Sequence, residues 1–180
     1  MFEIQQPLSL LFTKTARFRL EPAPREQLRD PSDLTAWLAA AGLSAPGSRV
    51  SDELLREARE LREAIYRSAR AVAEAATVPP DDRDLLNAWA DRHDAVRVLG
   101  DHGAGWRFPP AHAARSALAI VAVDAVDTVG GARDGTIKVC EGEGCVAVFL
   151  DNSRGRSRRW CSMATCGNRA KKAAMRNRAE

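Results

Sequence analysis

The stretch from Cys140 to Arg169, CEGEGCVAVFLDNSRGRSRRWCSMATCGNR, contains all 4 cysteines of a chain of 180 residues. They form two pairs with the same internal spacing, C-x4-C, and 15 residues separate one pair from the other. Because a Zn–S bond is about 2.3 Å long, two sulfurs on one tetrahedral ion lie about 3.8 Å apart. Two close pairs within one short segment can meet that requirement. The pattern therefore predicts a zinc ion held by Cys140, Cys145, Cys161 and Cys166.

The residues around each pair favour the local structure that such a site needs. Gly142 and Gly144 allow a tight turn between two β-rich runs, at 136–140 and 146–151. Ser162 is a suitable N-cap for a final helix over about 163–178. That helix is short and starts with a poor helix former, Gly167, so we expect the metal to anchor its first turn. We also expect Gly167 to allow close approach of the backbone of the first cysteine pair.

Two disulfides or four unrelated buried thiols are the alternative interpretations. The N-terminal sequence MFEIQQPLSLLFTKTARF has no basic segment before its short apolar run, so we expect no secretory signal. This predicts a cytoplasmic location, where thiols stay reduced. Unrelated thiols would not all gather in the last part of the chain. Four thiolates leave no open coordination position, which favours a structural zinc over a catalytic one.

Composition and charge suggest that the chain has two parts. Hydrophobic residues make up 45% of the sequence and charged residues 28%, which is usual for a globular protein. No apolar run approaches the about 20 residues that span a bilayer, so we expect no membrane partner. The net charge of +3 is uneven, because residues 1–137 carry −3 and residues 138–180 carry +6. The sequence predicts a body domain over 1–135 and a zinc-finger domain over 136–180.

The body is expected to be mainly helical. Apolar residues recur at helical spacing over 30–43, 51–76, 80–93 and 109–131, and alternation around a Gly-rich turn predicts a hairpin over 95–108. The expected fold is thus mainly α with a β-hairpin in the N-terminal domain, followed by a small ββα-type four-cysteine zinc finger. Together, the apolar faces of the helices predict one core: Trp37, Leu38, Leu54, Leu61, Ile65, Leu85, Trp89, Leu118 and Val121.

Polar residues predict how two of these helices begin and how one is stabilised. Ser32 or Asp33 is expected to cap the helix in 30–43, and Ser51 the helix that follows it. On the polar face of the second helix, i,i+4 spacing predicts the ion pairs Asp52–Arg56 and Glu63–Arg67.

The C-terminal motif resembles the CGNR zinc finger of bacterial proteins. The residues that carry the resemblance are the two cysteine pairs with Phe149-Leu150-Asp151, Ser153-Arg154, Arg158-Arg159-Trp160 and Cys166-Gly167-Asn168-Arg169. The body resembles the ABATE domain that usually accompanies this finger, through DPSDLTAWLAAAGL, the Trp106 hairpin and the order of elements. That domain is described as a stress-induced transcription regulator, so the resemblance implies DNA binding. The family's Leu-Asp-Phe-Val-Asn-Thr run differs here at Leu11 and Lys14, which leaves open any ligand role of these positions.

Basic residues of the finger are the candidates for DNA contact, because phosphates attract such a surface. The candidates lie on the loop and on the final helix: Arg154, Arg156, Arg158, Arg159, Asn168, Arg169, Lys171, Lys172, Arg176 and Arg178. At about 100° per residue, Arg169, Lys172 and Arg176 share one helix face. The alternative is a solvated face, in which Arg159 or Arg169 partly neutralises the formal −2 of four thiolates and Zn²⁺. Asn168 could contact DNA or hold the backbone.

Three classes of function compete. The first is a zinc-dependent DNA-binding transcription regulator whose body senses a small molecule in a pocket between the helices and the hairpin. The second is a protein–protein adaptor with a purely structural finger. The third is an enzyme, which no nucleophile–base spacing supports; its candidate groups would be His93, Asp94 and Asp101. We expect His93, His102 and His112 to be surface or core residues rather than ligands. A homodimer, the ligand and the DNA sequence are left open.

Overall fold

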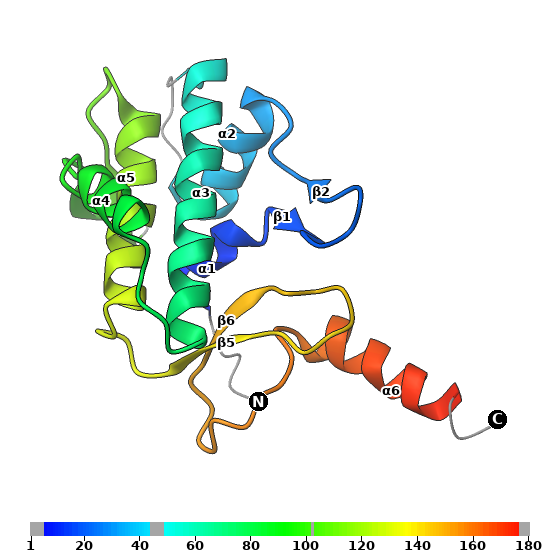
Figure 1. The fold of residues 1–180 in the computed structure, drawn as a ribbon. Coiled ribbons are helices and arrows are strands. Elements are labelled where there is room, and N and C mark those ends of the chain that lie inside the picture. Colours follow the sequence, from blue (N-terminus) through cyan, green and yellow to red (C-terminus); the bar gives the residue numbers. More distant parts are fainter. Residues whose placement is uncertain (1–5, 44–48, 102, 177–180) are drawn as a thin grey trace.

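The computed structural model describes residues 6–43, 49–101 and 103–176 (Figure 1). Its helices are α1 (Leu8–Thr13), α2 (Pro31–Ala40), α3 (Asp52–Ala73), α4 (Pro80–Ala90), α5 (Ala113–Val129) and α6 (Asn168–Arg176). A π-helical turn, Met163–Gly167, leads directly into α6. The strands form small antiparallel pairs: β1 (Ala16–Arg17) with β2 (Arg25–Glu26), β3 (Val96–Gly100) with β4 (Gly103–Arg107), and β5 (Thr136–Val139) with β6 (Val148–Asp151). The mainly helical prediction is confirmed, and the short β1–β2 pair was missed.

Helix α3 is the centre of the fold, because the other helices of the body pack around it (Figure 1). Its apolar stripe is buried as predicted, including Leu54, Leu61 and Ile65. Of the predicted core, only Trp37 and Leu85 are partly exposed, and both still pack against the main cluster. None of the helices in the described residues is both long and apolar enough to cross a bilayer.

The start of α2 differs from the sequence prediction. Its N-cap is Asp30, whose carboxylate accepts the backbone N–H groups of Ser32 at 2.8 Å and of Asp33 at 3.0 Å. The Asp33 carboxylate in turn accepts the N–H of Asp30, which completes a capping box. The predicted cap of α3 is confirmed, since Ser51 Oγ accepts the N–H of Leu54 at 3.1 Å.

Neither ion pair predicted within α3 forms. Arg56 pairs with Glu60 at 2.8 Å, and Arg67 pairs with Asp82 of α4. Glu63 pairs with Arg19 and with Arg62. Arg56 thus takes a different i,i+4 partner on the same helix. Arg67 and Glu63 instead pair with Asp82 and Arg62, which are buried, and an exposed i,i+4 pair contributes too little to compete.

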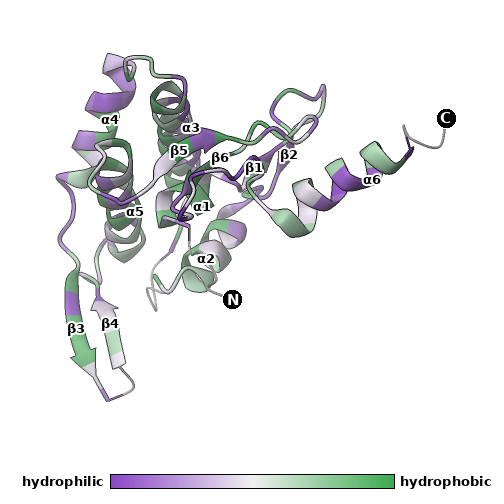
Figure 2. Cartoon of the chain, turned by 90° about the horizontal axis from the view of Figure 1, so that it is seen from below, coloured by the Kyte–Doolittle hydropathy of each residue, from purple (hydrophilic) through white to green (hydrophobic). Residues whose placement is uncertain are grey.

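The β5–β6 hairpin packs onto the body rather than standing apart from it. Ile137, Val148 and Leu150 are buried in one cluster with Leu10 of α1 and Tyr66 of α3. The Tyr66 hydroxyl donates to the carbonyl oxygen of Val146 at 3.0 Å. The Gln6 amide donates to Leu150 O at 2.9 Å and accepts from Leu150 N at 2.8 Å, as a neighbouring strand would. The hairpin therefore shares a core with the body, while α6 extends away from it (Figures 1 and 2).

Candidate metal centre

The four cysteines come together at the far end of the β5–β6 hairpin. Their sulfur atoms all lie within 4.8 Å of one another, and none is in a disulfide. Cys145 Sγ lies 3.7 Å and Cys166 Sγ 3.8 Å from Cys161 Sγ. The tetrahedral geometry of zinc requires sulfurs about 3.8 Å apart. The donor set therefore fits a tetrahedral zinc ion, and among the described residues it is the group able to hold a metal.

The first cysteine pair is held by a tight turn after β5. Cys140 N–H donates to Ala147 O at 2.8 Å, and Cys145 N–H donates to Gly142 O at 2.9 Å. Gly144 has a φ of 66°, which a residue with a Cβ rarely adopts. The backbone N–H groups of Gly142 and Cys161 point at Cys140 Sγ, at 3.4 and 3.3 Å. Such N–H groups stabilise a thiolate.

The two cysteine pairs approach each other closely at Gly142, and this contact requires a glycine there rather than at Gly167. A Cβ on Gly142 would lie 3.0 Å from Cys166 Cβ and 3.1 Å from its sulfur. A Cβ on Gly167 would instead meet the side chain of Met163, at 2.9 Å from its sulfur, and no atom of the first cysteine pair. The expected contact between Gly167 and the first pair is therefore wrong. The two halves of the site meet through the glycine of the turn, because the helix places Cys166 Cβ against it.

The thiols are too close together to ionise independently. Hydrogen bonds to Cys140 and Cys145, then burial, raise the pKa of Cys161 well above its usual range. A hydrogen bond to Cys140 raises the pKa of Cys145 to about 11. The contacts from Cys145 and Cys161 in turn hold the pKa of Cys140 far below its usual range. Like charges at this separation repel, so four thiolates are compatible only around a cation.

Asp151, at the end of β6, joins the loop of residues 152–159 to the hairpin. It is fully buried, and its Oδ2 accepts from Lys138 Nζ at 2.8 Å and from the N–H of Arg158 at 2.9 Å. Its Oδ1 accepts from the N–H and the hydroxyl of Ser153. Burial opposes the ionisation of Asp151, but the bonds from Lys138 and Ser153 outweigh it and hold its pKa well below the usual range. This carboxylate thus directs the loop toward Cys161.

We expect Asp151→Asn to lower stability by about 1–3 kcal/mol at neutral pH, because it leaves buried donors poorly matched. The pKa of Asp151 is lower in the folded than in the unfolded chain. Its contribution is therefore full above the unfolded value of about 3.9 and is lost as pH falls below it. Denaturant unfolding of both proteins between about pH 7 and about pH 3 measures this. The difference in the free energy of unfolding between the two proteins should become smaller as the pH falls. A difference that stays constant would contradict the stabilising role of the ionised Asp151. Asp127→Asn is the control, because Asp127 is exposed and has no ion pair among the described residues.

The structure separates the predicted DNA-contacting residues into engaged and free side chains. Arg156 bonds Asp134 and the Asp151 carbonyl oxygen, Arg158 bonds the Cys161 carbonyl oxygen, and Arg159 pairs with Glu141 at 2.6 Å. Arg169 lies against Cys166, and the Asn168 amide donates to Ala164 O at 3.1 Å. The remaining four are exposed and have no acidic partner in the described part of the chain: Arg154, Lys171, Lys172 and Arg176. Arg178 lies outside the described residues.

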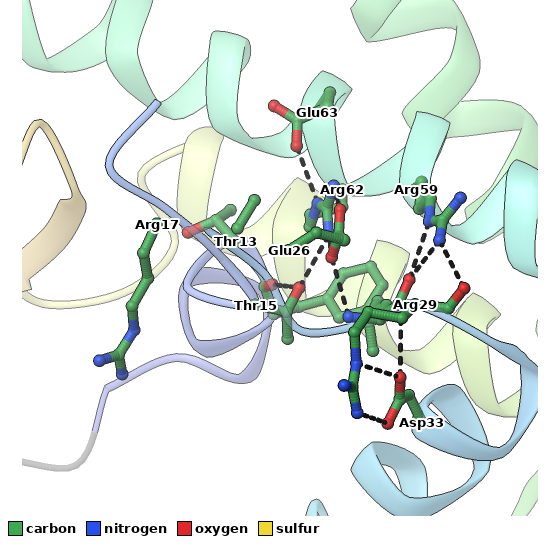
Figure 3. A network of polar contacts seen from close by, with 12 residues as sticks. Thr13, Thr15, Arg17, Glu26, Arg29, Asp33, Arg59, Arg62 and Glu63 are labelled. Atoms are coloured by element: carbon green, nitrogen blue, oxygen red, sulfur yellow. Dashed lines mark hydrogen bonds and ion pairs between the residues drawn. The ribbon is translucent and has the colours of Figure 1, made fainter. Parts of the chain in front are cut away.

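A polar network holds the segment before α2 against α3 (Figure 3). Lys14, Arg17 and Phe18 of this segment line a pocket together with three of the cysteines. The buried Arg62 donates to both carboxylate oxygens of Glu26 at 2.7 Å and to Thr15 Oγ1 at 3.2 Å. Arg59 donates to the carbonyl oxygens of Leu28 and Arg29. Burial opposes the charge on Glu26, but the bonds from Arg62 and the Leu28 N–H outweigh it and lower the pKa of Glu26. The sequence analysis missed this network, because its partners are far apart along the chain.

His93, His112 and the candidate enzyme groups Asp94 and Asp101 have no contact with the cysteines in the described residues. The His93 ring packs edge-on against Trp106 at 5.9 Å, and His112 bonds Asp94, which also accepts from Ser116. Asp101 is exposed next to the hairpin turn, and His102 lies outside the described residues. Four surface pockets of the described residues are lined without any residue of β3 or β4. A ligand pocket beside that hairpin stays a prediction.

Fold and site together define a helical body that carries a four-cysteine metal centre on a basic C-terminal segment. The chain belongs to the ABATE family, which matches residues 6–132 and is described as "Putative stress-induced transcription regulator". The CGNR zinc finger family matches residues 136–179. Both resemblances drawn from the sequence are thereby confirmed. None of the curated proteins matches the chain.

Proposed function

We propose that this protein is a DNA-binding transcription regulator in which a structural zinc ion, held by Cys140, Cys145, Cys161 and Cys166, orients a basic helix. The observation that carries the proposal is the position of α6. It begins within one turn of Cys166, buries none of its residues and projects from the body (Figures 1 and 2). A helix this short that buries none of its residues needs either a partner or an anchor. The family matches support both the zinc and the regulatory role.

The zinc ion would act as a scaffold in this proposal. Bound by four thiolates it has no open coordination position, so it would hold the turn after β5 and the start of the helix together. The segment would then be a ββα-type finger formed by β5, β6 and the helix over 163–176. We propose a binding role rather than an enzymatic one, since a zinc ion bound by all four thiolates would have no open position for a substrate.

The free basic residues would contact phosphates. Lys172 and Arg176 lie on one face of α6, Lys171 points to another side, and Arg154 is exposed on the loop that Asp151 holds. The arginines engaged with Asp134, Glu141 and Cys161 would keep the loop in place instead. Direct sequence readout requires a side chain at a base edge, and the free residues of α6 are the ones able to reach it.

Replacing Lys172 and Arg176 with alanine should weaken DNA binding without releasing zinc. Each lost phosphate contact is expected to reduce the slope of log K against log salt by about 0.9. The measurement is the affinity for a mixed-sequence duplex at several salt concentrations, together with zinc content. The double variant Arg56→Ala, Arg83→Ala removes the same charge from α3 and α4, where both arginines are exposed, and should bind as the unmodified protein does.

The adaptor function is the alternative that the same experiment tests. If the unmodified protein binds no duplex even at low salt, the transcription-regulator proposal is wrong and α6 is a protein-facing or solvated surface. Loss of binding in the control variant as well would mean that net charge, not the α6 face, attracts DNA. A small-molecule ligand of the body, a homodimer and a cytoplasmic location stay predictions.

A further inference from the structure

Lys14 is a basic residue of the body that lies beside the cysteines of the finger. It follows α1 directly, as its C-cap, and it is partly buried. A pocket of about 160 Å³ is lined by Lys14 and, from the finger, by Cys145, Cys161 and Cys166. Lys14 and three of the four cysteines therefore border the same space.

The ammonium group of Lys14 has no carboxylate partner among the described residues. No ion pair or side-chain hydrogen bond involves it there, whereas Lys138, Arg156 and Arg159 of the finger each have an acidic partner. Burial lowers the pKa of Lys14, the thiolates of Cys161 and Cys145 raise it, and Arg158 and Arg17 oppose them. Its neighbours of opposite charge are thus the sulfur atoms. Burying a charge without a counter-ion is costly, which raises the question of what offsets the cost.

Arg169 is a second basic residue beside the cysteine cluster. Its Nη2 lies 3.7 Å from Cys166 Sγ, and its Nε is buried without a hydrogen-bond partner. It too lines the pocket, and its guanidinium lies 5.7 Å from the centre of the Phe18 ring. In the part of the chain that the structure describes, neither cation has a carboxylate partner to offset its burial, and both line the pocket that the cysteines border.

We propose that Lys14 and Arg169 are the two counter-ions of the metal centre, one supplied by the body and one by the finger. The inference rests on the zinc proposed above. Four thiolates and one Zn²⁺ carry a formal charge of −2, which these two cations neutralise. Charged groups outside the ligand shell raise metal affinity when they stabilise the thiolate form of the ligands.

The body holds Lys14 rigidly enough for this role. Arg19 donates to the carbonyl oxygens of Thr13 at 2.7 Å and Ala16 at 2.6 Å, on either side of Lys14. Arg62 holds Thr15 through its hydroxyl. Figure 3 shows this segment crossing α3 with the Arg17 side chain pointing away from the network. Through Lys14, the metal centre therefore depends on the fold of the body as well as on its own ligands.

The test is zinc affinity, measured by competition with a chromophoric chelator on the full chain. Lys14→Met keeps the length of the side chain and removes its charge, and it should lower zinc affinity by about 10–100-fold. Lys14→Arg keeps the charge and should stay within about threefold of the unmodified protein. Arg17→Gln is the matched control: Arg17 lines the same pocket but is exposed, so its loss should leave the affinity unchanged.

Equal affinities for Lys14→Met and the unmodified protein would overturn the inference, and so would an equal loss in Arg17→Gln. If circular dichroism shows that Lys14→Met does not fold, the zinc affinity of Arg169→Gln tests the inference instead. This variant should reduce zinc affinity to a similar degree. A chain that binds no zinc at all would defeat the zinc proposal and this inference together. Zinc binding that does not depend on Lys14 or Arg169 would defeat this inference alone.

Discussion

Cys145→Ser should abolish stable zinc binding and unfold the metal-dependent part of the finger. In small zinc domains the metal supplies folding free energy of about 10–16 kcal/mol, and one missing thiolate removes much of it. The sequence alone suggests that the whole tail, 136–180, would unfold. The structure restricts this expectation, because β5 and β6 are buried against α1 and α3 by their own apolar side chains. We expect the turn at 140–147 and the helix over 163–176 to unfold while the β5–β6 hairpin stays paired.

Elemental analysis and amide hydrogen exchange measure these two outcomes separately. The unmodified protein should contain about one zinc per chain, and the variant less than about a tenth of that. Amides of α6 should lose protection in the variant, and those of Ile137 and Leu150 should keep theirs. Glu143→Ser is the matched control, since Glu143 lies between the first two cysteines and is exposed. Zinc below about a tenth per chain in unmodified protein purified without chelator would refute the metal site itself.

Glu26→Ala should destabilise the body by about 3 kcal/mol, near the lower end of the range for breaking a buried ion pair. The reason is that Arg62 is buried and would lose two of its bonds, keeping those to Glu63 and Thr15. For a chain of this size that corresponds to a fall in Tm of roughly 6–12 °C. Glu26 also accepts the N–H of Leu28, so the start of α2 should loosen as well.

Thermal and denaturant unfolding measure the loss of stability. Arg56→Ala is the control, because Arg56 lies on α3, the helix that also carries Arg62. Arg56 pairs with Glu60 at the surface, and removing an exposed pair costs at most about 0.5 kcal/mol. Replacing both partners, as Glu26→Leu with Arg62→Met, should recover part of the stability, because no unpaired charge stays buried. If Glu26→Ala costs no more than Arg56→Ala, the network does not hold the segment before α2 in place.

Features that depend on residues close together in the chain could be predicted from the sequence. The spacing within each cysteine pair indicated the two halves of the metal site, and the stripe through Leu54, Leu61 and Ile65 indicated the buried face of α3. The cap at Ser51 followed from the same kind of local rule. The family resemblances rested on local motifs as well. These patterns are short-range because a helix turn or a tight turn brings together residues at most a few positions apart.

Only the tertiary structure decided which of the alternative partners each polar residue takes. Asp30 rather than Ser32 caps α2, and Arg62 reaches Glu26 and Thr15 across the chain. Likewise, the sequence presents ten polar candidates for DNA contact as equals, and the fold engages five of them in other contacts. Lys14, 126 positions or more from the cysteines it faces, becomes part of the site only when α1 packs beside the finger. The reason is physical: pairing energy depends on burial and geometry, and residues distant in sequence acquire both only when the chain folds.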